Sequence, residues 1–377
     1  MIIDLSDANF KRIIDDTRLY LPMRWDGADF SATLNSLFNY YISRLEKLGT
    51  KESKHPRNIY QYADIEDIKR VCGLIKKTVD CYLNGFPSKA YLDFTDVMSV
   101  LMDQPLKIYQ KSVMEQFDDK GWYYDNGYND LKLFRVVSVP DNKPYQRNRV
   151  FHTPYNLRSK VSTNRYSIAG YPSLYLGTSL DLCCEEIHMN PYNGFALASL
   201  FKLERTLEFT NTNIQVIELG VKPQDFIGNQ ESENYSYGRV ISKDLLESNH
   251  VRSAYLLWYP LIAASSYIRT NKNDPFAAEY IIPQLLMQWV RSEIHTSLDD
   301  EYDQLIGIRY FSCASVKASD MGFNYVFPTS GQQKSAERPY CAILARAFRL
   351  TEPIYIHEYD NLRNCEHALT KKAFDSI

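Results

Sequence analysis

Apolar residues in the first third of the chain recur at intervals of three and four positions, which places them on one side of a helix. One such pattern runs through Leu34, Leu37, Phe38, Tyr41 and Leu45, and a second runs through Ile68, Val71, Cys72, Ile75 and Val79. Glycine and proline in residues 84–88 interrupt the second pattern, and Ser88 is the predicted N-cap of a third helix that continues to Leu101. The pattern predicts a helical N-terminal domain over residues 1–125.

Short β-rich runs replace the helical periodicity from about residue 133 onward. The predicted strands lie at 133–137, 173–176, 195–201, 214–219, 305–311 and 341–345, and the predicted helices at 179–189, 239–247 and 276–291. Strands outnumber helices there, and the two do not alternate regularly. The pattern therefore predicts an α+β domain with a mixed sheet over residues 126–377, rather than a doubly wound parallel sheet.

The composition is that of an ordinary globular protein, with 45% hydrophobic and 24% charged residues among 377 and a net charge of -3. A local concentration of basic and aromatic side chains stands out between positions 145 and 166. It contains Arg147, Arg149, Arg158, Lys160 and Arg165, interleaved with Tyr145, Phe151, Tyr155 and Tyr166. Such a cluster suits single-stranded nucleic acid or a small phosphorylated ligand. The absence of a basic excess elsewhere disfavours nucleic acid.

Cysteine usage and the apolar runs bear on where the protein acts. The seven cysteines show no CxxC spacing, which favours a reducing, cytoplasmic location and gives no sign of a metal site. The N-terminus has no basic segment followed by an apolar run, so no secretory signal is expected. The apolar run from Ala254 to Ile268 is short for a membrane span and contains Pro260, so we expect it to form core, with no membrane partner.

Three residues whose side chains suit ligand binding or catalysis follow one another at similar intervals: Arg165, Tyr175 and Glu186. The sequence contains no GxxxxGK[ST], GxGxxG, HExxH or GxSxG motif. A guanidinium binds phosphate or ribose oxygens, an aromatic ring stacks on a base, and a carboxylate stabilises positive charge that develops on a ribose. Tyrosines on strands are most often packing residues, and Glu185 and Glu186 also fit a solvated helix face. Only one of these adjacent glutamates is expected to face a site beside Tyr175.

The segment 164–187 resembles the central motif of the RES-domain family, in which an arginine precedes a Gly-x-Pro-x-x-Tyr strand and a glutamate follows one helix later. Residues 170–175 match the strand, and the offset selects Glu186 over Glu185. The family's serine corresponds to Ser312, although Phe311 stands where many members have proline. The resemblance covers roughly residues 133–327 and includes Arg135 in the opening strand. Tyr166 takes the place of the aromatic residue that accompanies the arginine.

The resemblance implies an ADP-ribosyltransferase-like fold that degrades NAD by cleaving the nicotinamide–ribose bond, in a toxin or defence effector. It implies catalytic roles for Arg165, Tyr175, Glu186 and Ser312, and NAD binding by Arg135 and Tyr166. NAD is then the substrate and no cofactor is expected, with inorganic phosphate as a candidate co-substrate. Phosphate, water and a macromolecule all remain open as the acceptor, and so does an inactive sensor or interaction module. An antitoxin or other regulatory partner is expected, and the oligomeric state is open.

Overall fold

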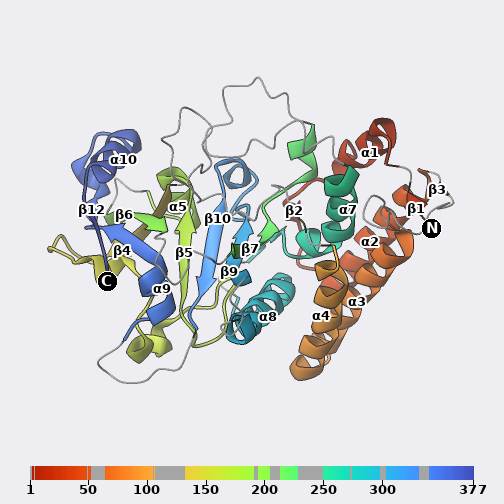
Figure 1. The fold of residues 1–377 in the computed structure, drawn as a ribbon, viewed down its shortest axis with the longest axis horizontal. Helices are drawn as coiled ribbons and strands as arrows, with labels where there is room; N and C mark the ends of the chain where they lie inside the picture. Colours follow the sequence, from red (N-terminus) through yellow and green to blue (C-terminus); the bar gives the residue numbers. More distant parts are fainter. Residues whose placement is uncertain are drawn as a thin grey trace. The chain divides into compact units, whose positions relative to one another are not determined.

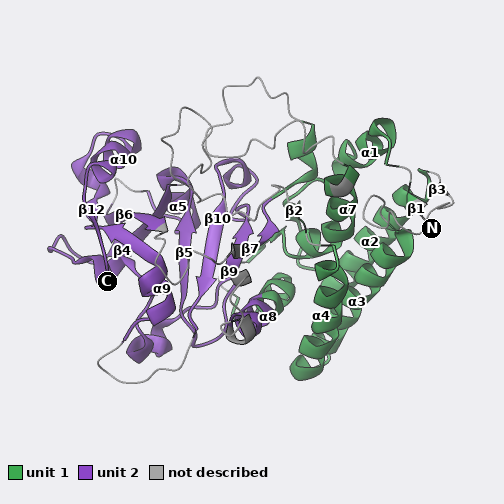
Figure 2. Ribbon diagram, in the orientation of Figure 1, with its two compact units in different colours: residues 1–110, 221–234, 240–286 green, residues 111–220, 235–239, 287–377 purple. Residues whose placement is uncertain are grey.

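The computed structural model describes residues 2–3, 5–48, 50–51, 64–104, 106, 132–190, 194–203, 213–227, 249–271, 274–297, 303–330 and 339–377. The chain divides into two compact units (Figure 2). Unit 1 comprises residues 1–110, 221–234 and 240–286, and unit 2 comprises residues 111–220, 235–239 and 287–377. The domain boundary expected at residue 125 falls in 107–131, outside the described residues. Unit 1 is discontinuous in sequence, because a later segment joins the N-terminal helices.

Unit 1 is built mainly of helices, as the periodicity of its first hundred residues predicts (Figure 1). Its described elements are β1 (Ile2–Ile3), α1 (Asp7–Ile14), η1 (Thr17–Leu19), β2 (Met23–Arg24), α2 (Phe30–Glu46), β3 (Thr50–Lys51), α3 (Ile65–Leu83), α4 (Pro87–Met102), η6 (Pro223–Phe226), α7 (Asn249–Ala264), β8 (Tyr267–Ile268) and η7 (Ala278–Tyr280). Helix α8 (Ile281–Ser297) begins in this unit and ends in unit 2. The helix expected at 239–247 lies outside the described residues.

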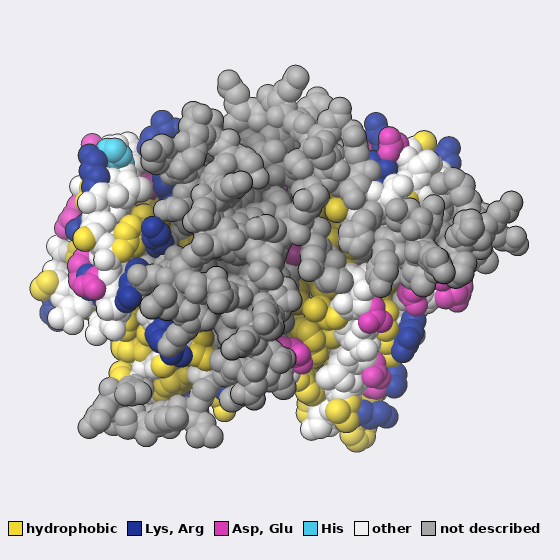
Figure 3. Space-filling model, in the orientation of Figure 1, with side chains coloured by type: hydrophobic (Ala, Val, Ile, Leu, Met, Phe, Trp, Pro, Cys, Tyr) yellow, Lys and Arg dark blue, Asp and Glu magenta, His cyan; other side chains and the backbone are white. Residues whose placement is uncertain are grey.

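Helix α4 begins two residues earlier than the sequence suggests. Phe86 is its N-cap and Pro87 its first residue, so the prediction of Ser88 as the cap is wrong. Proline suits the first helical position because its fixed φ is already helical and its missing N–H is not needed there. Around the turn between α3 and α4, Leu83, Phe86 and Leu92 remain exposed. Figure 3 shows apolar side chains at that end of the helical pair.

Helix α7 is the reason that unit 1 includes residues far along the chain. Almost all of its side chains are buried, so it needs apolar neighbours on every side. Tyr41 of α2 donates a hydrogen bond to the carbonyl of Leu256 at 2.8 Å, and Trp258 donates to the carbonyl of Gln104 at 2.8 Å. The apolar run around Pro260 is thus core, as its length predicts. In the described residues, no helix is both long and apolar enough to cross a bilayer.

Unit 2 is organised around one mixed sheet, in agreement with the α+β prediction. Its described strands are β4 (Leu133–Val139), β5 (Ser173–Gly177), β6 (Phe195–Leu203), β7 (Asn213–Leu219), β9 (Asp303–Tyr310), β10 (Asn324–Pro328), β11 (Phe348–Thr351), β12 (Ile354–Tyr355) and β13 (Phe374–Asp375). Their order is β13-β11-β6-β4-β5-β10-β9-β7, with β12 also paired to β6. The pairing of β7 with β9 is parallel, and the other pairings are antiparallel.

The described helical segments of unit 2 are short: η4 (Arg147–Val150), η5 (Tyr155–Lys160), α5 (Leu180–Glu186), η8 (Ala318–Asp320), α9 (Ala342–Ala347), η9 (Ile356–Glu358) and α10 (Leu362–Thr370). The strand predicted at 341–345 is wrong, because these residues form most of α9. Alanine favours a helix, and a short apolar run does not by itself distinguish a helix from a strand. The strand follows the helix, as β11.

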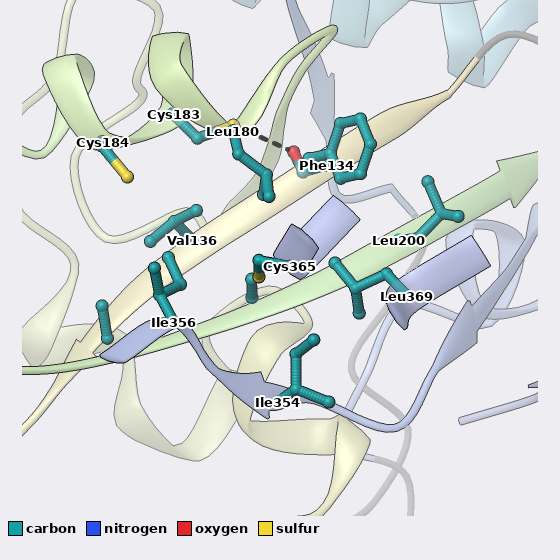
Figure 4. Close-up of a cluster of buried hydrophobic side chains, with 12 residues drawn as sticks. Phe134, Val136, Leu180, Cys183, Cys184, Leu200, Ile354, Ile356, Cys365 and Leu369 are labelled. Atoms are coloured by element: carbon teal, nitrogen blue, oxygen red, sulfur yellow. Dashed lines mark hydrogen bonds between the residues drawn. The ribbon is translucent and has the colours of Figure 1, made fainter. Parts of the chain in front are cut away.

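A buried apolar cluster fixes α5 against the sheet and against α10 (Figure 4). It contains Phe134, Val136, Leu180, Cys183, Cys184, Ala196, Ala198, Leu200, Ile354, Ile356, Cys365 and Leu369. The thiol of Cys183 donates a hydrogen bond to the carbonyl of Phe134 at 3.3 Å. Burial raises the pKa of Cys184 and of Cys365 to about 12, so these thiols stay protonated and act as apolar groups. The cluster holds the helix that ends at Glu186.

Candidate active site

Strand register places three polar side chains on one face of the sheet in unit 2. Val326 of β10 lies opposite Tyr175 of β5, and Asn324 lies opposite both Gly177 of β5 and Tyr310 of β9. Residues directly opposite each other on neighbouring strands point to the same face, and so do residues two apart on one strand. Tyr175, Asn324 and Tyr310 therefore project from the same face across three adjacent strands.

The turn that contains Arg165 is fastened to this face. The Ser167 hydroxyl accepts a hydrogen bond from the N–H of Asn164 at 2.9 Å and donates to the carbonyl of the same residue at 2.9 Å. The hydroxyl of Tyr175 donates to the carbonyl of Tyr166 at 2.5 Å. The ring of Tyr166 packs on the ring of Tyr310, with centroids 4.5 Å apart. These contacts hold Arg165, which is largely buried, at the tyrosine cluster.

Helix α5 brings Glu186 to the same place. The helix begins after Ser179, whose hydroxyl accepts from the N–H of Leu182 at 3.2 Å and donates to the carbonyl of Met321 at 3.0 Å. At the other end, Oε1 of Glu186 accepts a hydrogen bond from Nδ2 of Asn324 at 2.5 Å. The neighbouring Glu185 instead accepts from the hydroxyl of Ser315 at 3.4 Å. The two adjacent carboxylates thus have different surroundings.

Tyr310 is the residue around which the predicted trio gathers. Burial raises the pKa of its phenol well above the usual value, and the carboxylate of Glu186 and the neighbouring Tyr175 and Tyr166 raise it further. Arg165 lowers the same pKa by its positive charge. Arg165, Tyr175 and Glu186, separated along the chain, all act electrostatically on one buried hydroxyl. That hydroxyl remains protonated at neutral pH and is a hydrogen-bond donor.

Arg135 of β4 lies between Phe134 and Val136, which face α5, so its side chain points to the opposite face of the sheet from Tyr175. Burial lowers the pKa of its guanidinium to about 10, while Cys183 and Tyr175 raise it, and Arg149 lowers it. The group therefore keeps its charge at neutral pH. Its Nη1 is buried and has no hydrogen-bond partner among the described residues. A buried N–H without a partner is costly, so this atom is available to a ligand oxygen.

Ser312 is placed differently from the other predicted residues. It lies two residues after Tyr310 and is completely buried. Its hydroxyl accepts from the N–H of Ala314 at 3.1 Å, and in the described part of the chain it makes no hydrogen bond to Arg165, Tyr175 or Glu186. The structure therefore brings together Arg165, Tyr166, Tyr175 and Glu186, places Arg135 on the other face of the sheet, and gives Ser312 a role in the turn after β9.

Asn324 and Tyr310 are the members of the cluster that the sequence does not identify. Tyr310 lies in the strand predicted at 305–311, whereas Asn324 lies outside the predicted strands, and a single asparagine or tyrosine at a strand end is common. The burial of Asn324, which is 5% exposed, is the signal that it has a partner, and burial is known only from the fold.

A separate cavity opens on the Glu185 side of α5. It has a volume of about 1000 Å³, and His188, Lys317 and Arg363 contribute to its mixed-charge lining together with Glu185. Arg165, Tyr175 and Glu186 do not line it. Within the described residues, no cluster of three or more histidine, cysteine, aspartate or glutamate side chains suits a metal ion.

The chain is similar to a bacterial protein whose name indicates a toxin. It is 25% identical over 358 residues to the "Putative toxin YopC" of Bacillus subtilis (strain 168), across 93% of this chain and 71% of that protein. No family model matches the chain, and no solved structure matches it. The similarity thus supports a toxin-like protein, and the resemblance to RES domains rests on the residues quoted above.

Proposed function

We propose that this protein is a toxin-like enzyme that consumes NAD by cleaving its nicotinamide–ribose bond, on a sheet domain of the ADP-ribosyltransferase type. The observation that carries the proposal is the gathering of Arg165, Tyr175 and Glu186 around Tyr310 on one face of the sheet. The RES resemblance selects the same three residues. The similarity to a protein named as a toxin supports the biological role.

Glu186 has the central role in this chemistry. Breaking the bond releases neutral nicotinamide and leaves an oxocarbenium-like ribose, so a group that stabilises a cation at that carbon lowers the barrier. The amide of Asn324 holds Oε1 of Glu186 and leaves the second carboxylate oxygen for the ribose. A carboxylate that is already oriented does not have to reorganise when the charge develops.

The other residues bind and orient the substrate. The hydroxyl of Tyr175 is bound to the carbonyl of Tyr166, which fixes the Tyr175 ring as a surface for stacking on the nicotinamide. Arg165 donates to phosphate or ribose oxygens. Ser312, being buried, supports the site by holding the backbone that follows Tyr310.

The test is mass spectrometry of the products that purified protein makes from NAD, with and without inorganic phosphate. We expect nicotinamide release by the wild type and a loss of about 10²–10³-fold in Glu186→Gln, the size of effect seen when one transition-state-stabilising group is removed. Glu185→Gln is the matched control, since its carboxylate bonds to Ser315 instead, and it should retain activity close to that of the wild type.

The second product identifies the acceptor. ADP-ribose phosphate indicates phosphate, ADP-ribose indicates water, and mass added to a protein or nucleic acid indicates an ADP-ribosyltransferase. Equal nicotinamide release by the two glutamine variants would remove Glu186 from its assigned role. Absence of both NAD binding and turnover would favour a sensor or interaction module. Because NAD consumption harms the cell that makes the enzyme, an inhibitory partner such as an antitoxin belongs to this proposal.

A further inference from the structure

The basic residues between positions 147 and 165 do not form one common surface in the fold. Arg147 is neutralised by Glu352 and Asp375, each at 2.8 Å. Arg165 belongs to the cluster around Tyr310. Arg158, at η5, has a different environment, which it shares with an arginine from a distant part of the sequence.

Arg158 and Arg291 meet at the ring of Tyr171. Their guanidinium carbons lie over that ring, 4.9 Å and 4.1 Å from its centroid. All three side chains are half-buried, so solvent and ligands reach them. The ring attracts each cation, but a cation–π contact at such a site contributes only about 0.5–1 kcal/mol. Two like charges near one ring repel each other, so the arrangement favours an anion between or beside them.

Neither guanidinium has its charge compensated within the described part of the chain, where no carboxylate forms an ion pair with Arg158 or Arg291. Nε of Arg158 is buried and makes no hydrogen bond to the described residues. Arg291 uses Nε to bond the carbonyl of Thr329 at 3.0 Å, and Thr329 in turn bonds the carbonyl of Pro172. Arg291 is thereby fixed to the end of the β5–β10 ladder, with its terminal N–H groups left for a ligand.

We propose that Arg158 and Arg291, brought together on Tyr171, bind a phosphoryl group, and that this group is the diphosphate of the dinucleotide substrate. The assignment to NAD rests on the proposed function. Tyr171 precedes Tyr175 by four residues, the last of them in β5, and at ~3.3 Å per residue an extended chain of this length separates the two Cα atoms by about 13 Å. That separation suits the diphosphate of a ligand whose nicotinamide lies at Tyr175. It is too long for an attacking phosphate, which must come within about 3.5 Å of the reacting carbon.

The first experiment measures inorganic diphosphate binding to the full chain by isothermal titration calorimetry. The test variant is the double Arg158→Gln/Arg291→Gln, and the control is the double Arg149→Gln/Lys160→Gln, which removes the same charge from exposed positions of the same segment. We expect the wild type to bind, the test variant to bind at least about tenfold more weakly, and the control to remain within about twofold. No binding by the wild type, or equal affinity in wild type and test variant, overturns the proposal.

The source of the phosphoryl group is identified by turnover kinetics. If the site holds the substrate's diphosphate, the test variant raises the KM for NAD at least about tenfold and leaves the cleavage of nicotinamide riboside, which lacks phosphate, unchanged. A raised requirement for inorganic phosphate at unchanged KM for NAD instead assigns the site to the co-substrate. If the wild type binds diphosphate through the pair but releases no nicotinamide from NAD, the site stands and the proposed function fails.

Discussion

At the scale of single residues, the side-chain amide of Asn324 distinguishes the two adjacent glutamates of α5. Glu185 and Glu186 are chemically identical neighbours, yet one is bound by the hydroxyl of Ser315 and the other by Nδ2 of Asn324. Asn324 reaches Glu186 because register places it opposite both Gly177 and Tyr310. The role that we propose for Glu186 therefore depends on a residue more than a hundred positions away, through one charge-assisted hydrogen bond.

Replacing Asn324 tests this dependence without touching the proposed catalytic carboxylate. Asn324→Leu removes the donor to Glu186, and we expect kcat for nicotinamide release to fall by about tenfold or more, with a smaller change in KM, since the carboxylate loses its orientation. Ser315→Ala is the matched control, because it removes the hydrogen bond to Glu185. Similar losses of kcat in the two variants would show that Asn324 has no special role in the reaction.

At the scale of elements, the position of α5 depends on its close approach to β5. A Cβ added at Gly177 would lie 2.8 Å from Sγ of Cys183, which is buried in the cluster beneath the helix. Gly177→Ala should therefore destabilise the protein by about 1–3 kcal/mol and displace Glu186. Thermal unfolding and nicotinamide release measure the two effects. Gly73→Ala on α3, where a new Cβ meets nothing within 4 Å, should be neutral or stabilising by up to about 1 kcal/mol. Equal melting temperatures for the two variants would contradict this.

Some helices and strands of the fold are predictable from the sequence, and others are not. Helices such as α2 and α3 follow from periodicity, because one side of each is buried, and strands such as β5 and β6 follow from short β-rich runs. The strand predicted at 341–345 is a helix, since its short apolar run carries no period that separates the two. The gathering of Arg165, Tyr175 and Glu186 was expected from a family motif. The place of Asn324 and the pairing of Arg158 with Arg291 were not predicted, because both depend on register and on chain crossings that no local pattern encodes.

At the scale of the molecule, the discontinuity of unit 1 has a simple physical origin. Helix α7 is buried on nearly all sides, and its partners include Tyr41 and Gln104 from the N-terminal segment. A linear division at residue 125 assigns α7 to the sheet domain, because periodicity shows that a helix is buried but not against which neighbours. The N-terminal helices therefore need the later segment to complete their core. For this reason, functional tests should use the full chain.

Unit 2 carries a buried histidine that makes stability depend on pH. His152 is completely buried, its Nε2 accepts from the N–H of Cys341 at 2.9 Å, and its Nδ1 lies 2.8 Å from the carbonyl of Thr153. This pairing requires the neutral ring with its proton on Nδ1. Burial lowers the pKa of His152 to about 4; the Thr153 carbonyl opposes this shift, and Arg135 adds to it. Protonation of Nε2 would replace an accepted hydrogen bond by repulsion between two N–H groups.

Stability depends on pH because the pKa of His152 is lower in the folded protein than in the unfolded chain. Below pH ~6.5 the unfolded chain protonates this histidine, whereas the folded protein does not until the pH approaches about 4, so the free energy of unfolding decreases as the pH falls through that window. Between pH 7.5 and 5 the loss due to His152 should be about 2 kcal/mol. Urea unfolding followed by circular dichroism, compared with His152→Gln, isolates it, because other groups titrate alike in both proteins. Glutamine is able to accept from Cys341 without titrating, so the variant should lose about 2 kcal/mol less over this interval; parallel pH profiles would show that His152 is not the group responsible.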